Sequence, residues 1–299
     1  MTGNKLIILA AGNGTRLGPI TAGGYPKPLV DVYDKPCIYY SIAAAIASGH
    51  TSVGIIIKPG TQQLFVAHFG HGARLGIQIE YIEQPVQRGI ADAFVVAKDF
   101  IGADGVTLML GDNIFIGDSF TKAMIEAGNS NGSATVFALR VPLKEASKFG
   151  VVEFRNGKAV SIEEKPEKPK SPFIIPGVYF YDNSVIEAAR TLEPSARGEY
   201  EISDLNQLYL ERGDLRVVEL SNDVDWHDTG TADTQLEAAI AVQTWYRQHG
   251  TIFGSPEVEA LKAGLISVEQ FTANANQPGI VKSAYGEYLQ QELETYLSA

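Results

Sequence analysis

The feature that most constrains the fold is an alternation, through residue 110, of short apolar runs with segments of helical periodicity. Runs rich in valine and isoleucine predict strands that are covered on both faces. We place such strands at residues 6–9, 53–58, 77–82 and 106–110, and helices at residues 38–47, 62–69 and 90–100. This alternation predicts the α/β class, with a Rossmann-like three-layer αβα arrangement around a mostly parallel sheet.

The pattern changes after residue 150. The dipeptide Asn156-Gly157 is typical of a tight hairpin turn, and strand-like segments flank it on both sides. We expect strands at residues 151–154, 159–162 and 175–181, and helices at residues 201–212, 236–246, 256–263, 268–272 and 285–296. The middle part therefore extends the first sheet into a mixed sheet. We predict one domain over residues 1–230 and a helical C-terminal appendage over residues 231–299.

Composition excludes several classes of function. The 299-residue chain carries 24 Lys and Arg against 35 Asp and Glu, a formal net charge of −11, whereas a nucleic-acid-binding surface is basic. This acidic balance predicts that nucleic acid is not a partner. No apolar segment is long enough to span a bilayer, so we expect no membrane partner either. The single Cys37 cannot form an intramolecular disulfide, and its apolar surroundings predict a buried structural thiol. The simplest placement is cytoplasmic.

A glycine-rich loop follows the first predicted strand and reads Leu9-Ala10-Ala11-Gly12-Asn13-Gly14-Thr15-Arg16-Leu17. Glycine lets the backbone approach a ligand, and its N–H groups can point at anionic oxygens. Arg16 and the downstream Lys27 add two positive charges, so the loop predicts a site for a nucleoside triphosphate. It is not a Walker A loop, which needs Gly-Lys-Ser/Thr. It is not a dinucleotide fingerprint either, because Leu17 stands where a third small residue is required.

This loop resembles the signature of the sugar-1-phosphate nucleotidylyltransferases, Gly-x-Gly-Thr-Arg-Leu with a downstream lysine. Six further segments resemble the glucose-1-phosphate thymidylyltransferase branch of that family, in the same order: Tyr33-Asp34-Lys35-Pro36, Leu110-Gly111-Asp112-Asn113-Ile114-Phe115, Phe149-Gly150-Val151-Val152-Glu153-Phe154, Glu163-Glu164-Lys165-Pro166, Pro194-Ser195-Ala196-Arg197-Gly198-Glu199 and Asp228-Thr229-Gly230-Thr231. The resemblance covers nearly the whole chain. It implies the fold of the nucleotide-diphospho-sugar transferases.

The resemblance implies a nucleotide-binding part over residues 1–115. Its nucleotide-binding positions are Leu9, Ala11, Gly12, Gly14, Thr15, Arg16, Gln84, Gly89 and Asp112. Arg16 would hold the triphosphate, and Lys27 would lie near the α-phosphate and the leaving pyrophosphate. Together with Lys165 these two residues form the implied catalytic set.

The resemblance implies a sugar-binding part over residues 116–230. Its sugar-phosphate-binding positions are Gly150, Glu164, Lys165, Gly177, Tyr179 and Arg197. Asp112 and Asp228 match metal-binding aspartates, and Mg²⁺ is the implied cofactor because it prefers few carboxylates plus phosphate oxygens. The roles of Asn113 and Trp226 stay open at this stage.

The implied reaction joins two small-molecule substrates, a nucleoside triphosphate and a hexose 1-phosphate, and releases pyrophosphate. A phosphomonoester with a second pKa of about 6 is mostly ionised at neutral pH, so the attacking oxygen needs no general base. The difficulty is repulsion between two polyanions. Catalysis should therefore consist of positioning and electrostatic stabilisation, which basic residues and a metal ion supply.

Four departures from the branch leave the base and the sugar open: Ala11, Pro28, Gln87-Arg88 and Pro176. We expect dTTP and glucose 1-phosphate, with UTP or another base and sugar pair as the alternative. Two other functions compete. A metal-dependent glycosyltransferase of similar fold could use Asp112-Asn113 as its metal motif, but it would have no pyrophosphate for Arg16 and Lys27 to hold. A non-catalytic nucleotide-sugar sensor would need no metal for displacement.

The predicted C-terminal appendage, residues 231–299, indicates that the protein forms an oligomer. Its helices carry apolar stripes at Leu236, Ile240 and Tyr246, then at Val258, Leu261 and Leu265. Some of these residues should pack on the parent domain. The appendage also resembles that of the long thymidylyltransferases, which implies a homotetramer and feedback inhibition by a deoxysugar nucleotide at a second site between subunits.

Overall fold

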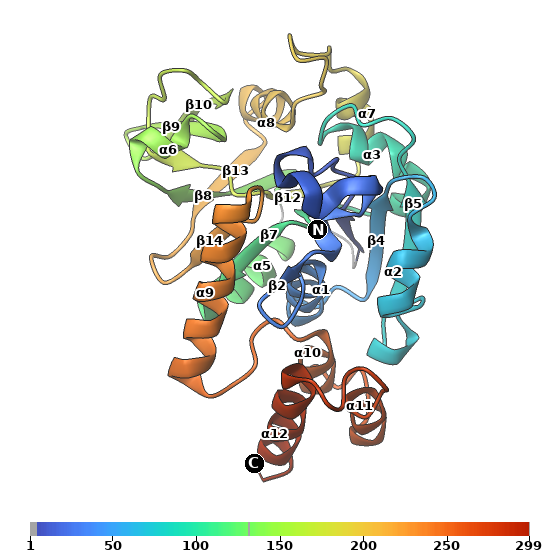
Figure 1. Cartoon of the computed structure of the whole chain (residues 1–299). Coiled ribbons are helices and arrows are strands. Elements are labelled where there is room, and N and C mark those ends of the chain that lie inside the picture. The colour runs from blue at the N-terminus through green and yellow to red at the C-terminus, as the bar shows by residue number, and fades with distance from the viewer. Residues whose placement is uncertain (1–4, 131, 299) are drawn as a thin grey trace.

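The fold is known from a computed structural model that describes residues 5–130 and 132–298. A mixed sheet crosses the molecule, with helices on both sides of it (Figure 1). Its strands are β1 (Lys5–Leu9), β4 (Ser52–Ile57), β5 (Gln78–Glu83), β6 (Val106–Leu110), β8 (Ala134–Arg140), β9 (Gly150–Arg155), β10 (Lys158–Glu164), β11 (Phe173–Ile174), β12 (Val178–Tyr181) and β13 (Leu215–Glu219). The order is β10-β9-β11-β8-β12-β6-β1-β4-β5, and β13 pairs with β8.

The four early strands are parallel to one another, as predicted. Strand β1 shows why helices cover both faces. Successive side chains of a strand point to opposite faces, and Leu6 and Ile8 belong to one buried core whereas Ile7 belongs to another. The three-layer αβα prediction is thus confirmed. Strand β12 runs antiparallel to β6 and to β8, which makes the sheet mixed.

The helices of the first part are α1 (Ile38–Ala47), α2 (Gln62–Phe69), α3 (Asp92–Val96) and α4 (Lys98–Ile101). The first two have the predicted bounds. The helix predicted at 90–100 is wrong in detail, because it is divided in two at Ala97, whose φ of −91° and ψ of 13° lie outside the helical range. Two short strands, β2 (Asp31–Val32) and β3 (Lys35–Pro36), form a hairpin between the glycine-rich loop and α1.

The middle part contains the predicted hairpin of β9 and β10. The strand predicted at 175–181 is wrong over its first half. Gly177 has a φ of 78°, which breaks the extended backbone before β12. The remaining elements of this part are α5 (Asp118–Gly128), α6 (Leu143–Ala146), α7 (Val185–Arg190) and α8 (Ile202–Glu211), and the strand pair β7 (Asn113–Ile116) and β14 (Asp225–Asp228).

The segment predicted as an appendage contains the helices α9 (Ala232–His249), α10 (Pro256–Lys262), α11 (Val268–Ala275) and α12 (Ala284–Ser298). Helix α9 packs beside β14, and α10 packs against α1 (Figure 1). Tyr246, Val258 and Leu261 are buried, but Leu236 and Ile240 are 62% and 53% exposed, so the stripe of α9 does not pack on the parent domain along its whole length. Among the described residues, no helix is long and apolar enough to cross a membrane.

Candidate active site

A cleft of ≈ 1120 Å³ opens beside the carboxyl end of β6. This is the edge at which parallel α/β sheets bind ligands. It brings together predicted residues from both parts of the chain, namely Arg16, Asp112, Gly150, Glu164, Lys165, Gly177, Tyr179 and Asp228. The other predicted positions (Leu9, Ala11, Gly12, Gly14, Thr15, Lys27, Gln84, Gly89 and Arg197) are not part of its lining.

Strand pairing brings the two predicted metal-binding aspartates together. Asp112 stands between β6 and β7, and the antiparallel pairing of β7 with β14 sets Asp228 opposite Asn113. Thr229 completes the connection, because its backbone N–H and its hydroxyl both donate to the carbonyl of Asp112, at 3.1 and 2.9 Å. Two carboxylates from distant segments therefore face the same space.

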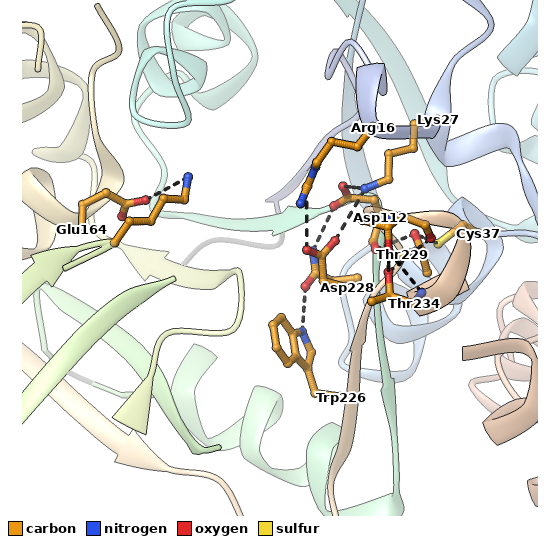
Figure 2. A network of polar contacts seen from close by, with 12 residues as sticks. Arg16, Lys27, Cys37, Asp112, Glu164, Trp226, Asp228, Thr229 and Thr234 are labelled. Carbon is orange, nitrogen blue, oxygen red and sulfur yellow. Dashed lines mark hydrogen bonds and ion pairs between the residues drawn. The ribbon is translucent and has the colours of Figure 1, made fainter. Parts of the chain in front are cut away.

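Two basic side chains meet this carboxylate pair (Figure 2). The Lys27 ammonium donates to Asp112 Oδ2 and lies 3.6 Å from Asp228 Oδ1, while Arg16 Nη2 lies 3.9 Å from Asp228 Oδ2. Lys27 is buried and Arg16 is exposed. Burial, and next the charge of Asp112, raise the pKa of Asp228 against the opposing effect of Lys27 and Arg16. The pair therefore favours a cation between its carboxylates.

The donor set fits magnesium. In the described part of the chain no cluster contains three or more His, Cys, Asp or Glu side chains able to hold a metal. The protein would thus supply two carboxylates, and Mg²⁺ usually takes its other ligands from substrate phosphates and water.

The structure answers the question left open for Asn113 and Trp226. Asn113 Nδ2 donates to Asp112 Oδ1 at 2.9 Å, and Trp226 Nε1 donates to Asn113 Oδ1 at 2.7 Å. Asn113 is buried, so this chain of bonds fixes the orientation of the Asp112 carboxylate. Trp226 also lines the cleft, and its ring stands edge-on to Phe149.

The glycine-rich loop lies directly beside this centre. Gly14 has a φ of 62°, and a Cβ there would stand 2.9 Å from Thr21 Cγ2 and 3.2 Å from Lys27 Cβ. Only glycine fits this approach to the lysine. At the other end of the loop, the carbonyl of Leu9 accepts a bond from Gly111 N at 3.0 Å. Gly12 has no heavy atom within 4 Å of its Cβ position, which leaves its backbone open to a ligand.

The segment predicted to read the base is adjacent to that loop. Gln87 Nε2 donates to the carbonyl of Ala11, which joins the two loops. Gly89 has a φ of 102°, and a Cβ there would stand 2.4 Å from Tyr200 O. Gln84 is buried, and its amide donates to Asp92 Oδ2 at 3.0 Å. The departure at Arg88 has a structural role, because its guanidinium pairs with Asp92 at 2.9 Å.

Glu164 lines the cleft away from Asp112 and Asp228, and two other predicted sugar-phosphate residues contact it (Figure 2). Gly177 instead lies beside Leu110 and Asn113. Lys165 Nζ lies 3.4 Å from Glu164 Oε1, and Arg197 Nη2 lies 3.5 Å from the same oxygen. Arg197 also pairs with Glu201 at 2.7 Å. Lys165 in the lining and Arg197 beside the lining residue Glu164 thus form a second set of basic groups, held by carboxylates and separate from Arg16 and Lys27.

Sequence reasoning missed Ser203, which donates to Glu164 Oε2 from the first turn of α8. A Cβ on Gly150 would stand 2.6 Å from Ser203 Oγ, so this glycine makes room for the serine. A lone serine gives no signal in a sequence. It also missed part of the lining from in and around α6 and from the first two turns of α9 with its cap, namely Pro142, Glu145, Lys148, Thr231, Thr234 and Glu237.

The prediction that Cys37 is a buried structural thiol agrees with the structure. Cys37 is buried before α1, and burial raises the pKa of its thiol to about 12. Such a thiol is inert.

The chain matches the Nucleotidyl transferase family over residues 5–244. A glucose-1-phosphate thymidylyltransferase of Neisseria meningitidis is 46% identical over 286 residues, which are 95% of this chain and 98% of that protein. One of Mycobacterium tuberculosis is 46% identical over 289 residues, 96% of this chain and 98% of that protein.

Solved structures agree with these relatives. A Bacillus anthracis protein assigned as a glucose-1-phosphate thymidylyltransferase, in complex with sucrose, superposes with a TM-score of 0.73 at 37% identity, over 79% of this chain and 94% of that one. A UDP-glucose pyrophosphorylase complexed with UDP-glucose has a TM-score of 0.71 at 22% identity, over 82% and 99%, which shows a shared fold.

Proposed function

The chain belongs to the Nucleotidyl transferase family, and we propose that it transfers a thymidylyl group from dTTP to glucose 1-phosphate with release of pyrophosphate. The single observation that carries this proposal is the layout of charge in the cleft. One basic pair, Arg16 and Lys27, faces two carboxylates, and a second pair, Lys165 and Arg197, flanks Glu164 of the other wall. Two anionic substrates can therefore be held on opposite sides of one reaction space.

In this mechanism the triphosphate lies along the glycine-rich loop, with Arg16 and Lys27 on its phosphates. Lys27 is placed to neutralise charge that develops on the α-phosphate and on the leaving pyrophosphate. Arg16 can bind two oxygens at once through its planar guanidinium. Both side chains are already directed toward the centre by Asp228, so little reorganisation is needed when the substrate arrives.

The hexose 1-phosphate lies at the other wall. Lys165 and Arg197 hold its phosphate, and Glu164, oriented by Ser203, accepts bonds from sugar hydroxyls. A phosphate oxygen then forms a bond to the α-phosphorus while the bond to the pyrophosphate oxygen breaks on the opposite side. No side chain has to remove a proton, because the attacking oxygen is already ionised.

Asp112 and Asp228 are the residues that would hold Mg²⁺, with Asn113 fixing the first of them. The ion, when bound, supplies further positive charge beside the phosphate oxygens. The chain's own contribution is to keep two half-buried carboxylates converged on one site.

Assembly as a homotetramer is part of the proposal. The exposed Leu236 and Ile240 on α9 support it, because a subunit contact would remove them from water. We also propose feedback inhibition by a deoxysugar nucleotide at a second site. This second site would lie between subunits of the proposed tetramer. A cytoplasmic location follows from the need for nucleoside triphosphates.

The test is pyrophosphate release from a panel of nucleoside triphosphates, each with and without glucose 1-phosphate and Mg²⁺. We expect release only with both substrates and the metal, and best with dTTP. Preference for a purine triphosphate would move the base assignment to another branch of the family. Release that does not depend on the sugar phosphate would contradict the proposal.

A further inference from the structure

The proposed mechanism leaves one sequence motif unused, Tyr33-Asp34-Lys35-Pro36. It forms the turn and second strand of the β2–β3 hairpin, with Tyr33 at a φ of 66°, a conformation that a tyrosine rarely adopts. The Lys35 side chain is only 2% exposed. A buried ammonium group is costly unless it is paired, so the chain must have a reason to place it there.

A cage of aromatic and acidic groups surrounds the Lys35 ammonium. Its Nζ lies 2.9 Å from Asp34 Oδ1 and 3.2 Å from the hydroxyl of Tyr246. The Tyr246 hydroxyl in turn donates to Asp34 Oδ2 at 2.9 Å. The rings of Tyr40, Tyr246 and Tyr285 stand 4.4, 5.6 and 5.4 Å from Nζ, within the range of cation–π attraction. Two of these tyrosines belong to the appendage.

A second buried ion pair continues the network across the same boundary. The hydroxyl of Tyr285 donates to Glu257 Oε2 at 2.6 Å, and Arg74 of the catalytic domain pairs with Glu257 Oε1, also at 2.6 Å. The Glu257 side chain is fully buried. The Arg74–Glu257 ion pair therefore crosses the boundary between the catalytic domain and the appendage. Removal of either part would leave one charge of this pair without its partner.

On its other side the hairpin leads to the catalytic centre. Cys37 N donates to Val30 O, and Val30 N donates to Lys27 O, both at 3.0 Å, so the hairpin closes the turn that carries Lys27. Cys37 Sγ lies 3.7 Å from the hydroxyl of Thr229, which donates to the carbonyl of Asp112 (Figure 2). Lys35 is thus two residues from a side chain that touches the aspartate segments.

We propose that Lys35, clamped between Asp34 and the tyrosines of the appendage, is a positioning residue that sets the Lys27 turn against Asp112 and Asp228. The residue touches no substrate. The proposal rests on the proposed function only for its kinetic readout, because the geometry of the Lys27 turn can be measured without substrate.

The test uses three variants of the full chain. The double variant Asp34→Asn/Lys35→Met removes both charges, so that no unpaired charge stays buried. Tyr246→Phe removes only the hydroxyl that bonds both residues, from the appendage side. The control is Lys5→Met, which breaks another lysine–aspartate contact of 2.9 Å, with Asp104, at the amino end of β1. Circular dichroism establishes folding, and hydrogen exchange at the amides of Val30 and Cys37 is followed without substrate or metal.

We expect the double variant to fold and to lose kcat by about tenfold or more, because misplacing a catalytic group by about 1 Å costs roughly a hundredfold and a smaller shift costs less. KM for glucose 1-phosphate should stay within about twofold, since the other wall is untouched. Tyr246→Phe should show the same pattern at a smaller size, and both variants should exchange the Val30 and Cys37 amides faster than the control does.

Unchanged kcat and unchanged exchange in folded Tyr246→Phe and in the double variant would overturn the proposal, even if their melting temperatures fell. If the double variant did not fold, Tyr246→Phe would decide alone. An inactive wild-type protein would contradict the proposed function, and the exchange measurement would still decide the positioning role.

Discussion

Asp228→Asn should separate activity from stability. Asp228 faces Asp112, Lys27 and Arg16, and burial together with Asp112 raises the pKa of its carboxyl group. A raised pKa in the folded state means that the ionised carboxylate destabilises the folded chain at neutral pH. The neutral amide has almost the same shape and removes this repulsion, while Lys27 keeps its bond to Asp112. The metal-free variant should therefore melt at the same temperature as the wild type or higher.

The same substitution should lower turnover. Lys27 Nζ lies 3.6 Å from Asp228 Oδ1, and a unit positive charge at this distance attracts the carboxylate by about 4–5 kcal/mol at an effective dielectric constant of about 20. If solvent at this partly exposed carboxylate removes about half of that energy, about 2–3 kcal/mol is lost, which is roughly a hundredfold in rate.

Two measurements check this pair of effects. Thermal melting without metal gives the stability change, and pyrophosphate release at saturating substrates gives turnover. Asp225→Asn, on the same strand, is the control, because Asp225 is exposed and its ion pair is with His227, away from the two basic side chains of the centre. Turnover near the wild-type value in Asp228→Asn, with Mg²⁺ still required, would refute the metal assignment. A large loss of stability would refute the electrostatic reasoning.

Three further predictions follow from other parts of the structure. Burial lowers the pKa of His50 from 6.5 to about 4, so the unfolded chain takes up this proton at a higher pH than the folded chain does. About 3 kcal/mol of the free energy of unfolding, present above pH 6.5, should therefore be lost as the pH falls toward 4. Denaturant midpoints of the wild type and of His50→Gln, measured at both ends of this pH range, check the prediction. Lys165→Ala should weaken use of the sugar phosphate by about 1.5–3 kcal/mol in kcat/KM, whereas a loss confined to dTTP would mean that the two substrates are reversed. The pocket should prefer dTTP to dUTP by only about tenfold, because one methyl group distinguishes them, and discrimination by several orders of magnitude would contradict an apolar contact with that methyl.

Helices and strands were predictable from the sequence where a pattern within the segment itself determines their bounds. Helices α1 and α2 have the predicted bounds because apolar spacing, and a glycine after the end of each, mark them. The strand predicted at 175–181 was wrong over its first half because Ile175 and Val178 look alike in a pattern, while Gly177 between them has a positive φ and no room for a side chain beside Leu110. Strand β13 has no fully buried residue, because Leu215, Val217 and Val218 are only half-buried and the other two residues are exposed, so its short apolar signal was missed.

The candidate site was predictable only through its motifs. Periodicity could not bring Asp228 to Asp112, because that contact depends on the pairing of β14 with β7. The roles of Ser203 and Lys35 depend on neighbours from distant segments, Glu164 for the first and Tyr246 for the second. Residue type alone marks neither of them.

The most direct test of the central claim follows the α-phosphorus of the nucleotide. The protein is incubated with glucose 1-phosphate, Mg²⁺ and dTTP that is radiolabelled at either the α- or the γ-phosphorus, and the products are separated. We expect the α label to appear in a nucleotide sugar and the γ label in pyrophosphate, in equal amounts and at equal rates. Release of the γ label as inorganic phosphate, or an α label that never reaches the sugar, would contradict it.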